Sequence, residues 1–438
     1  MFKQRNVNCC KTYGCKNLGV LNSPSYQQQG QRVLCLECGF YFPVIGEHAL
    51  NSFKKQVNKG YQGLISLCPA CGDGKALVRH GYTRNGVQRV RCGDCQVTFS
   101  QYYSEPASSR LITLGEHIQR GESLTANCGE RNYNNTRLGR DLSKMAFHCR
   151  LVQSQFIPLS HEVELSTAVF FLNFNASSNR LYVIVSADKK SNRVIAVSTN
   201  YAPHANEIPE VFHYNMGEEE VCSGKNMILR VFAKDRLMSR RKLYFDAQYG
   251  AAQVKKNDGG IMVKPVLAAY RHFELVKDLT GRDVLSVRHY LEHECFIYGG
   301  CLMANVDGVL NGNCHISFVY EQGVSNTIKS GRTEMFTSDI IWNDAWYYYS
   351  QPNYNLAVCS LTGSQGRRRA LDATLEPAQS FIRFVQHHPY YPRLTHHSPA
   401  RINDLLEFLL LEYNLRFTNM DVPFRTGCLP LPTPFACH

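Results

Sequence analysis

The chain has 438 residues, of which 44% are hydrophobic and 19% are charged, proportions that suit a globular protein of two or three domains. It holds no apolar run of about eighteen residues, which excludes a membrane-spanning helix, and its start, MFKQRNVNCC, lacks the apolar stretch of a secretory signal. We therefore expect a cytoplasmic protein with no membrane partner.

Positive charge is concentrated at the N-terminal end. Residues 1–150 contain 20 Lys and Arg against 9 Asp and Glu, whereas residues 151–438 contain 28 against 27. A basic segment joined to a nearly neutral body is typical of a module that binds a polyanion. The charge distribution therefore predicts nucleic acid as a partner.

Eight cysteines in the first hundred residues have the spacing of two zinc ribbons. They are Cys10, Cys15, Cys35 and Cys38 in the first set and Cys68, Cys71, Cys92 and Cys95 in the second. Thiolates on a tight turn can share one Zn²⁺, which takes four ligands in a tetrahedron. We expect two structural zinc sites, in ribbons over 1–60 and 61–105, unless these are simply buried cysteines. Cys9 competes with Cys10 as a ligand.

The remaining nine cysteines are scattered singly between Cys128 and Cys437. A disulfide framework is typical of a much shorter secreted chain. The cysteine pattern therefore favours a reducing compartment with metal sites.

The second ribbon contains a hairpin, ALVRHGYTRNGVQRVRCGDCQVTF, with an Asn-Gly pair between two alternating strands. Four arginines project from it. They are Arg79, Arg84, Arg89 and Arg91. Arginines contact phosphates, which position a protein on DNA without reading its sequence. We expect these four side chains to bind DNA.

Three short helices are predicted over residues 106–150, in the segments SRLITLGEHIQRGE, SLTANCGE and TRLGRDLSKMAFHCR, with Thr136 as N-cap of the last. Such an arrangement fits a helix-turn-helix, whose last helix enters the major groove by its first residues. The candidate base-reading residues are Asn134, Asn135, Arg137 and Arg140. A three-helix spacer with no DNA contact is the alternative.

The clearest β region covers residues 160–202, where three β-rich runs joined by polar turns predict an antiparallel meander. Later strands are expected at 283–294 and 315–322. The run ARINDLLEFLLLEYNLRF predicts an amphipathic helix that packs on the core, before a Pro-rich tail. The fold class is therefore α+β with several domains.

The motifs CPACG, VRHGYTRNGVQRVRC, CGDC and VTF, in this order, give residues 66–150 a resemblance to the small zinc-ribbon, helix-turn-helix protein of bacterial insertion sequences. The rest is more loosely similar to larger bacterial transposase-like proteins, through LYVIVSADKKSNRVIAV, the RHFELVKDL and LEHE segments, and EYNLRFTNMDVPFRTGCLP. This resemblance implies a mixed α/β core of the ribonuclease-H-like type over residues 151–438.

An active core of that kind holds two Mg²⁺ or Mn²⁺ ions with acidic residues, and these ions activate the attacking oxygen and stabilise the leaving one. The first predicted strand has Ala168 and Asn173 where the resemblance implies an aspartate, and Glu162 and Glu164 lie toward its beginning. This departure leaves a catalytically degenerate core open as an alternative to an active one.

The best candidate acids are Asp188, Glu292 and Glu294. Asp188 closes the second strand, and the alternative is that it opens the DKKSN turn. The other two follow the presumed fourth strand, where a solvated face is the alternative. The third acid stays open among Glu321, Glu334 and Glu376.

Two further stretches have alternative interpretations. The histidine pairs around PYYPR, at 387–388 and 396–397, suit a metal site or a polar surface loop. The aromatic run 346–349 suits base stacking or a strand packed on one face.

The resemblance and the charge together imply a transposase-like protein that binds element DNA, forms a homo-oligomer on it, and cleaves and transfers DNA strands. The alternative is a catalytically inactive, transposase-derived DNA-binding regulator. A third possibility is that the ribbons bind other proteins, and the concentration of basic charge counts against it.

Overall fold

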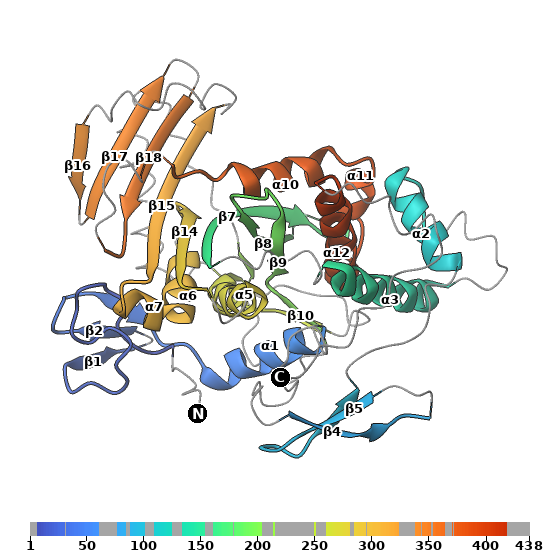
Figure 1. The fold of residues 1–438 in the computed structure, drawn as a ribbon, viewed down its shortest axis with the longest axis horizontal. Helices are drawn as coiled ribbons and strands as arrows, with labels where there is room; N and C mark the ends of the chain where they lie inside the picture. Colours follow the sequence, from blue (N-terminus) through green and yellow to red (C-terminus); the bar gives the residue numbers. More distant parts are fainter. Residues whose placement is uncertain are drawn as a thin grey trace.

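The computed structural model is a mixed α/β arrangement in which one large sheet lies between two groups of helices, with two small sheets nearer the N-terminus (Figure 1). The residues it describes are 7–30, 32–60, 77–84, 88–100, 109–124, 134–153, 161–177, 179–203, 213–214, 249–250, 260–280, 284–294, 296–323, 338–342, 344–351, 354–363, 370 and 372–417. Among these residues, no helix has the length and apolar character needed to cross a bilayer.

The large sheet has eight strands in the order β16-β17-β18-β15-β14-β7-β8-β9. The strands are β7 (Glu162–Asn173), β8 (Arg180–Asp188), β9 (Val194–Thr199), β14 (Ser286–Glu292), β15 (Cys314–Gly323), β16 (Ser338–Trp342), β17 (Asp344–Gln351) and β18 (Tyr354–Ser360). β14 runs parallel to β7 and β15, and the other neighbouring pairs are antiparallel. The predicted meander and the two later predicted strands are therefore confirmed.

The central strands are apolar because both of their faces are covered. In β8, every residue after Arg180 is buried. Val183 and Val185 contribute to one apolar cluster, whereas Tyr182 and Ile184 contribute to another on the opposite side of the sheet. A strand buried on both faces reads as a continuous hydrophobic run, as LYVIVSA does here.

Helices cover the two faces of the sheet. On one side lie α5 (Pro265–Thr280), α6 (Ile297–Ala304) and α7 (Val306–Leu310), joined by α1 (Glu47–Gly60). On the other lie α2 (Ser109–Gln119), α3 (Asn135–Gln153), α10 (Glu376–His387), α11 (Tyr391–Leu394) and α12 (Pro399–Leu415). The last of these is the amphipathic C-terminal helix predicted from the sequence, and it packs on the core as expected.

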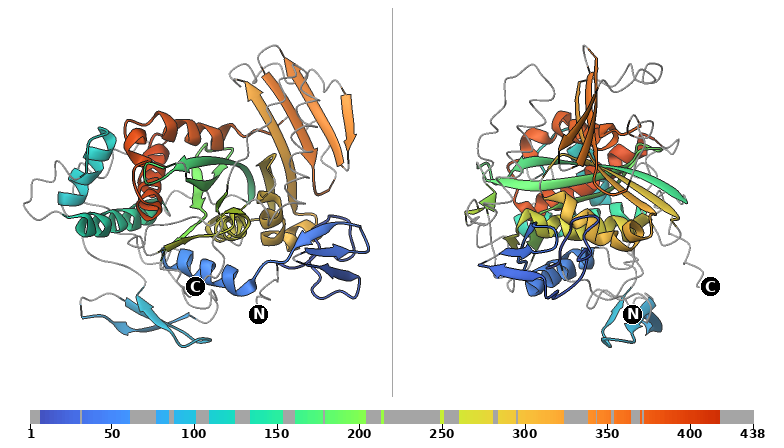
Figure 2. Two further views of the ribbon diagram at one scale, coloured as in Figure 1. Left: turned by 180° about the vertical axis from the view of Figure 1, so that it is seen from behind. Right: turned by 90° about the vertical axis from the view of Figure 1, so that its left-hand side faces the viewer.

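The two small sheets each have three antiparallel strands. The first contains β1 (Tyr26–Gln29), β2 (Arg32–Cys35) and β3 (Tyr41–Pro43), and the second contains β4 (Leu77–Tyr82), β5 (Gln88–Cys92) and β6 (Thr98–Ser100). We call residues 7–46 the first cysteine module and residues 77–100 the second cysteine module. In Figure 2 the first lies beside α6 and α7, whereas the second stands apart from the large sheet in both views.

Two short strand pairs complete the described secondary structure. They are β10 (Tyr201–Pro203) with β13 (Gly260–Met262), and β11 (His213–Tyr214) with β12 (Tyr249–Gly250).

Two of the three helices predicted after the second ribbon are seen as α2 and α3, and most of the segment predicted as the middle helix lies outside the described residues. The predicted N-cap Thr136 is wrong. Asn134 Oδ1 accepts the backbone N–H of Arg137 at 2.9 Å, so Asn134 caps α3 and the helix begins one residue before Thr136.

Helix α3 is part of the main core. Leu138, Leu142 and Met145 are buried in the same apolar cluster as α12 and the large sheet. Polar contacts tie the same two helices together. Ser143 Oγ donates to Asp404 Oδ2 at 2.7 Å, and Arg150 Nε donates to Glu407 Oε1 at 2.9 Å.

The α3–α12 contact makes stability depend on pH. Burial raises the pKa of Asp404 to about 6, so ionising this carboxyl opposes folding. The stabilisation is complete below the unfolded pKa near 3.8 and is lost as the pH rises through about 6. We expect Asp404→Asn, which still accepts from Ser143, to stabilise the chain at pH 8 by up to about 3 kcal/mol.

Thermal unfolding at pH 4 and pH 8 checks this expectation. The gain should shrink at pH 4, where the wild-type carboxyl is protonated. Asp372→Asn, at an exposed position, is the matched control and should show little change at either pH. A variant of Asp404 that is destabilised at pH 8 would contradict the argument.

Candidate metal centre and strand-end acids

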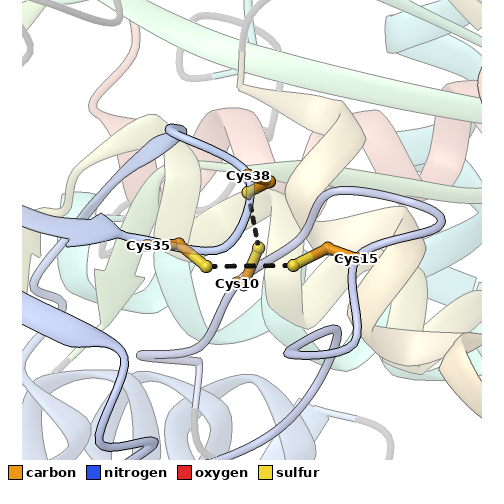
Figure 3. A group of neighbouring side chains, drawn as sticks. All are labelled: Cys10, Cys15, Cys35 and Cys38. Carbon is orange, nitrogen blue, oxygen red and sulfur yellow. Dashed lines mark hydrogen bonds between the residues drawn. The ribbon is translucent and has the colours of Figure 1, made fainter.

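Four cysteines of the first cysteine module converge on one point. Cys10, Cys15, Cys35 and Cys38 present their sulfur atoms toward one another, all within 4.8 Å (Figure 3). The sulfur atoms of Cys10 and Cys38 are 3.6 Å apart, and those of Cys15 and Cys35 are 3.8 Å apart. A tetrahedron with Zn–S bonds of about 2.3 Å requires sulfur separations of roughly 3.8 Å. The set therefore fits a four-coordinate zinc ion.

Nearby N–H groups favour the thiolate form of Cys35, whereas burial raises the pKa of Cys10 and that of Cys15. The backbone of Asn17 donates to Cys15 Sγ, and its side chain donates to Cys35 Sγ, both at 3.4 Å. Burial opposes ionisation of Cys35, but the hydrogen bond from Asn17 and those from the amides of Glu37 and Cys38 outweigh it and lower its pKa to about 7. Because Zn²⁺ binds the thiolate, these donors prepare the site for metal.

The choice between Cys9 and Cys10 is decided by the direction of the two side chains. Cys10 lies among the four ligands, whereas Cys9 Sγ contacts Met303 Sδ of α6 at 3.5 Å. Cys9 is fully buried in the core cluster that also contains Ile45 and Phe53. Cys9 is therefore a packing residue.

Lys11 joins the metal loop to the body. Its Nζ donates to the carbonyl oxygen of Cys9 at 3.0 Å and lies 5.1 Å from the ring of Phe42 and 5.9 Å from that of Tyr270. Its own carbonyl accepts the hydroxyl of Tyr298 at 3.1 Å. Burial lowers the pKa of Lys11, and the two rings offset part of the cost of desolvating its charge. The first cysteine module is thereby fixed to α5 and α6.

The second cysteine module repeats the turn of the first. The amide of Cys92 donates to Val97 O and that of Gln96 to Cys92 O, as the amide of Cys35 donates to Phe40 O and that of Gly39 to Cys35 O. Gln96 and Gly39 both have positive φ, at 61° and 71°. Cys68 and Cys71 lie outside the described residues. The structure describes the other two proposed ligands, Cys92 and Cys95, so the second zinc site stays a prediction.

The four arginines of the second cysteine module are exposed. Arg89 and Arg91 are two residues apart on β5, so they share one face, while Val90 and Cys92 between and beyond them point into the small core. Arg79 lies on β4, and Arg84 follows it toward the hairpin turn. The module therefore presents a basic surface.

Two of the predicted base-reading residues at the start of α3 make hydrogen bonds within the protein that the sequence does not indicate. The Asn134 side chain caps the helix, and the carbonyl of Asn135 accepts Arg401 Nη2 of α12 at 2.9 Å. Arg140 is exposed, and Arg137 is half-buried. The base-reading role of these four residues stays a prediction.

The predicted acids have separate environments. Asp188 Oδ2 accepts the N–H and the hydroxyl of Ser191 at 2.7 and 2.6 Å, as in the turn-opening alternative. Glu294 is buried and its Oε2 accepts from the Tyr182 hydroxyl and the Phe296 amide, each at 2.7 Å. Within the described ranges, the four cysteines are the group of three or more potential ligands that lies within 4.8 Å, and no carboxylate trio joins them.

Glu292 is the acid at the strand end. Its Oε2 accepts the amide of Val169 at 2.9 Å, at the point where β7 continues and its pairing with β14 stops. Ala168 is the residue of β7 that follows the last one paired with β14. The hydrogen bond of Glu292 is structural, because it satisfies an amide that the parallel ladder leaves open.

The remaining acidic candidates also have structural partners. Glu321 accepts the Leu375 amide at 2.6 Å and the Tyr354 hydroxyl at 2.6 Å, and so caps the start of α10. Glu376 pairs with Arg383 and Ser380 along α10, and Glu334 lies outside the described residues. Glu164 pairs with Lys189 at 2.6 Å.

Sequence patterns give no signal for several contacts. Ser166 Oγ accepts the Ala378 amide at 3.1 Å, which places α10 against β7 across 212 positions of chain. The sequence around Ser166 is an ordinary strand. The position of Lys11, by contrast, could have been inferred from the sequence. It lies between the ligands Cys10 and Cys15, and so short a loop keeps its side chain close to the module.

The aromatic and histidine-rich stretches belong to the packing. On β17, Trp346 and Tyr348 lie in one apolar cluster, whereas Tyr347 and Tyr349 lie in another on the opposite face, so the run packs on both faces. The histidines have local partners. His388 Nε2 lies 3.2 Å from Glu412, and His397 Nε2 lies 2.7 Å from the Tyr390 hydroxyl.

Comparisons of this chain with protein-family models, with curated proteins and with solved structures give no match.

Replacing neighbouring cysteines should separate metal binding from packing. We expect Cys10→Ala to lose one zinc equivalent per chain, because a structural site with three thiolates binds the ion far more weakly. Cys9→Ala should keep the wild-type zinc content. Elemental analysis of the two purified variants measures both results, and equal zinc loss in both would contradict the assignment of Cys9 to the core.

Proposed function

We propose that this chain is a transposase-like DNA-binding protein in which the second cysteine module supplies the main electrostatic contact with DNA. The observation that carries the proposal is the strand pattern of the large sheet. In the sheet order β9-β8-β7-β14-β15, the antiparallel meander β7-β8-β9 lies on one side, and β14 and β15 follow on the other side of β7 and run parallel to it. This pattern supports the ribonuclease-H-like core that the resemblance implies.

Charge and exposure support DNA as the partner. Arg79, Arg84, Arg89 and Arg91 are exposed on a small sheet that stands apart from the body, where a duplex can reach them (Figure 2). Asp94 is the acid among the described residues of this module. Phosphate contacts of this kind bind DNA without sequence preference. Sequence readout by α3 is the accompanying part of the proposal.

The zinc ion would hold the first cysteine module through Cys10, Cys15, Cys35 and Cys38. Its contribution there is structural, since four thiolates close the coordination sphere and leave no position for a substrate.

A two-metal site does not fit the donors at the end of β14. Two divalent ions about 4 Å apart need several converging carboxylates. Glu292 accepts the amide of Val169, Glu294 accepts the hydroxyl of Tyr182, and Asp188 accepts the hydroxyl of Ser191. We therefore favour the inactive, transposase-derived DNA-binding protein, and we derive no cleavage step.

DNA binding by the full chain should weaken steeply with salt. We expect the slope of log K against log[salt] to fall by about 1.8 when Arg89→Gln and Arg91→Gln are combined, since each phosphate contact contributes about 0.9. Fluorescence anisotropy with a random-sequence duplex measures this slope. The matched control is Arg180→Gln with Arg383→Gln, two exposed arginines of the body, which should leave the slope unchanged. A flat salt response in the wild type would contradict the proposal.

Catalysis is tested with Mn²⁺ and supercoiled plasmid. We expect no nicking by the wild type and no difference for Glu292→Gln, whose amide oxygen still accepts the Val169 N–H. Mn²⁺-dependent nicking that is abolished in Glu292→Gln would instead assign cleavage to this strand end. A nicking activity that persists in the variant points to a contaminant or another site.

A further inference from the structure

Exposed apolar side chains gather on the first cysteine module. Of the thirteen large apolar residues that are strongly exposed in the described part of the chain, seven belong to it. They are Tyr13, Val20, Leu21, Leu36, Phe40, Tyr41 and Val44. Leu36 is 59% exposed and Phe40 is 44% exposed. Apolar groups concentrated on one small module mark an interaction surface more often than scattered ones do.

This surface is held rigidly. The opposite side of the module is buried against the body through Cys9, Ile45 and the Lys11 contacts with Tyr298 and Tyr270. A partner that binds the exposed side therefore meets side chains that are already ordered, which reduces the entropy cost of association.

The charge on this surface does not suit nucleic acid. Lys16 is paired with Glu37 at 2.9 Å, and Glu37 also accepts from Ser25 at 2.8 Å. The other two basic residues of the described module, Arg32 and Lys11, are half-buried, and the ammonium group of Lys11 lies over the ring of Tyr270 in the body. The second cysteine module has four exposed arginines by comparison. The first module therefore fits a protein partner.

The outer strand of the module is open to pairing. β1 is an edge of its sheet, and within the described residues it pairs with β2 alone. Gln27, Gln28 and Gln29 are exposed, uncharged and free of proline. Monomeric proteins usually block such an edge with charge, proline or a bulge. The second cysteine module does so, with Arg79 on its edge strand β4 and a register shift between Arg79 and Tyr82.

Exposed apolar residues adjoin this edge. The Leu36 amide donates to Ser25 O at 2.9 Å, so Leu36 lies at the start of β1. Tyr41 reaches across the sheet, and its hydroxyl donates to Gln29 Oε1 at 3.2 Å. Val20 O accepts the hydroxyl of Tyr26, the first residue of β1, at 2.8 Å. These contacts place three exposed apolar residues of the module next to β1.

We propose that β1 of the first cysteine module pairs antiparallel with β1 of a second copy of this chain, forming a twofold dimer flanked by Val20, Leu36 and Tyr41. Antiparallel pairing of a strand with itself is the arrangement that a twofold axis produces. Glutamine both donates and accepts hydrogen bonds, so identical glutamines satisfy one another without like charges meeting. The other edge, β3, contains Pro43, which lacks an N–H for pairing.

The dimer is tested with the full-length, zinc-loaded chain by size-exclusion chromatography with light scattering, without DNA. We expect a mass of twice 49.8 kDa in the wild type. Combining Gln27→Lys with Gln29→Lys brings like charges together across the axis and should weaken dimerisation by about tenfold or more. Zinc content equal to that of the wild type shows that this variant is folded around its metal.

Two further variants make the test specific. Leu36→Ser with Tyr41→Ser should weaken the dimer similarly. The control, Val78→Ser with Tyr82→Ser, removes two strongly exposed apolar side chains from the second cysteine module and should leave the mass unchanged. A monomeric wild type at about 50 μM overturns the proposal, because a Kd above this concentration is too weak for a stable interface. A dimer that persists with both lysines also overturns it, and DNA binding is unaffected by either result.

Discussion

The parallel pairing of β14 with β7 is the contact on which the rest of the structure depends. It joins residues 162–167 to residues 286–291, so more than a hundred residues of chain must close before it forms. Once formed, it gives β15 an edge to pair with, and β15 in turn supports β18, β17 and β16. It also fixes Glu292 beside the amide of Val169. Long-range parallel pairing of this kind is slow to form because the loop entropy is lost before contacts are gained.

The two cysteine modules share a turn but differ in their surroundings. The first is joined to α5 and α6 by Lys11 and Cys9, so a metal bound to its four cysteines would stabilise a part of the main core. The second has a small apolar core of its own, formed by Val90, Cys92 and Phe99, which is separate from the main core. Similar sequence motifs therefore serve different ends: one module extends the body and exposes apolar groups, and the other exposes arginines.

Local patterns predicted much of the secondary structure and the first metal centre. The alternation in residues 160–202 gave the meander because both faces of those strands are covered, and the cysteine spacing gave the four ligands because a short knuckle fixes their separation. Contacts set by distant residues were beyond such patterns. Three such contacts join residues that are tens to hundreds of positions apart in the chain. They are the cap of α10 by Glu321, the hydrogen bond from the Ala378 amide to Ser166, and the bond from Tyr182 to Glu294. Thr136 was mistaken for the cap because Asn134, an equally suitable residue, lies two positions before it.

The position of Cys9 has a consequence for biosynthesis. Its partner Met303 is 294 residues further along the chain, so a ribosome working at about 5–20 residues per second needs roughly 15–60 s to supply it. During that interval the N-terminal segment can already bind zinc through its own four ligands, while the underside with Cys9, Ile45 and Phe53 waits uncovered. The nascent chain would then expose an apolar surface that includes the Cys9 thiol, next to an occupied metal site. If zinc binds Cys10 at this stage, Cys9 is kept out of the metal site until Met303 has been synthesised and can pack against it.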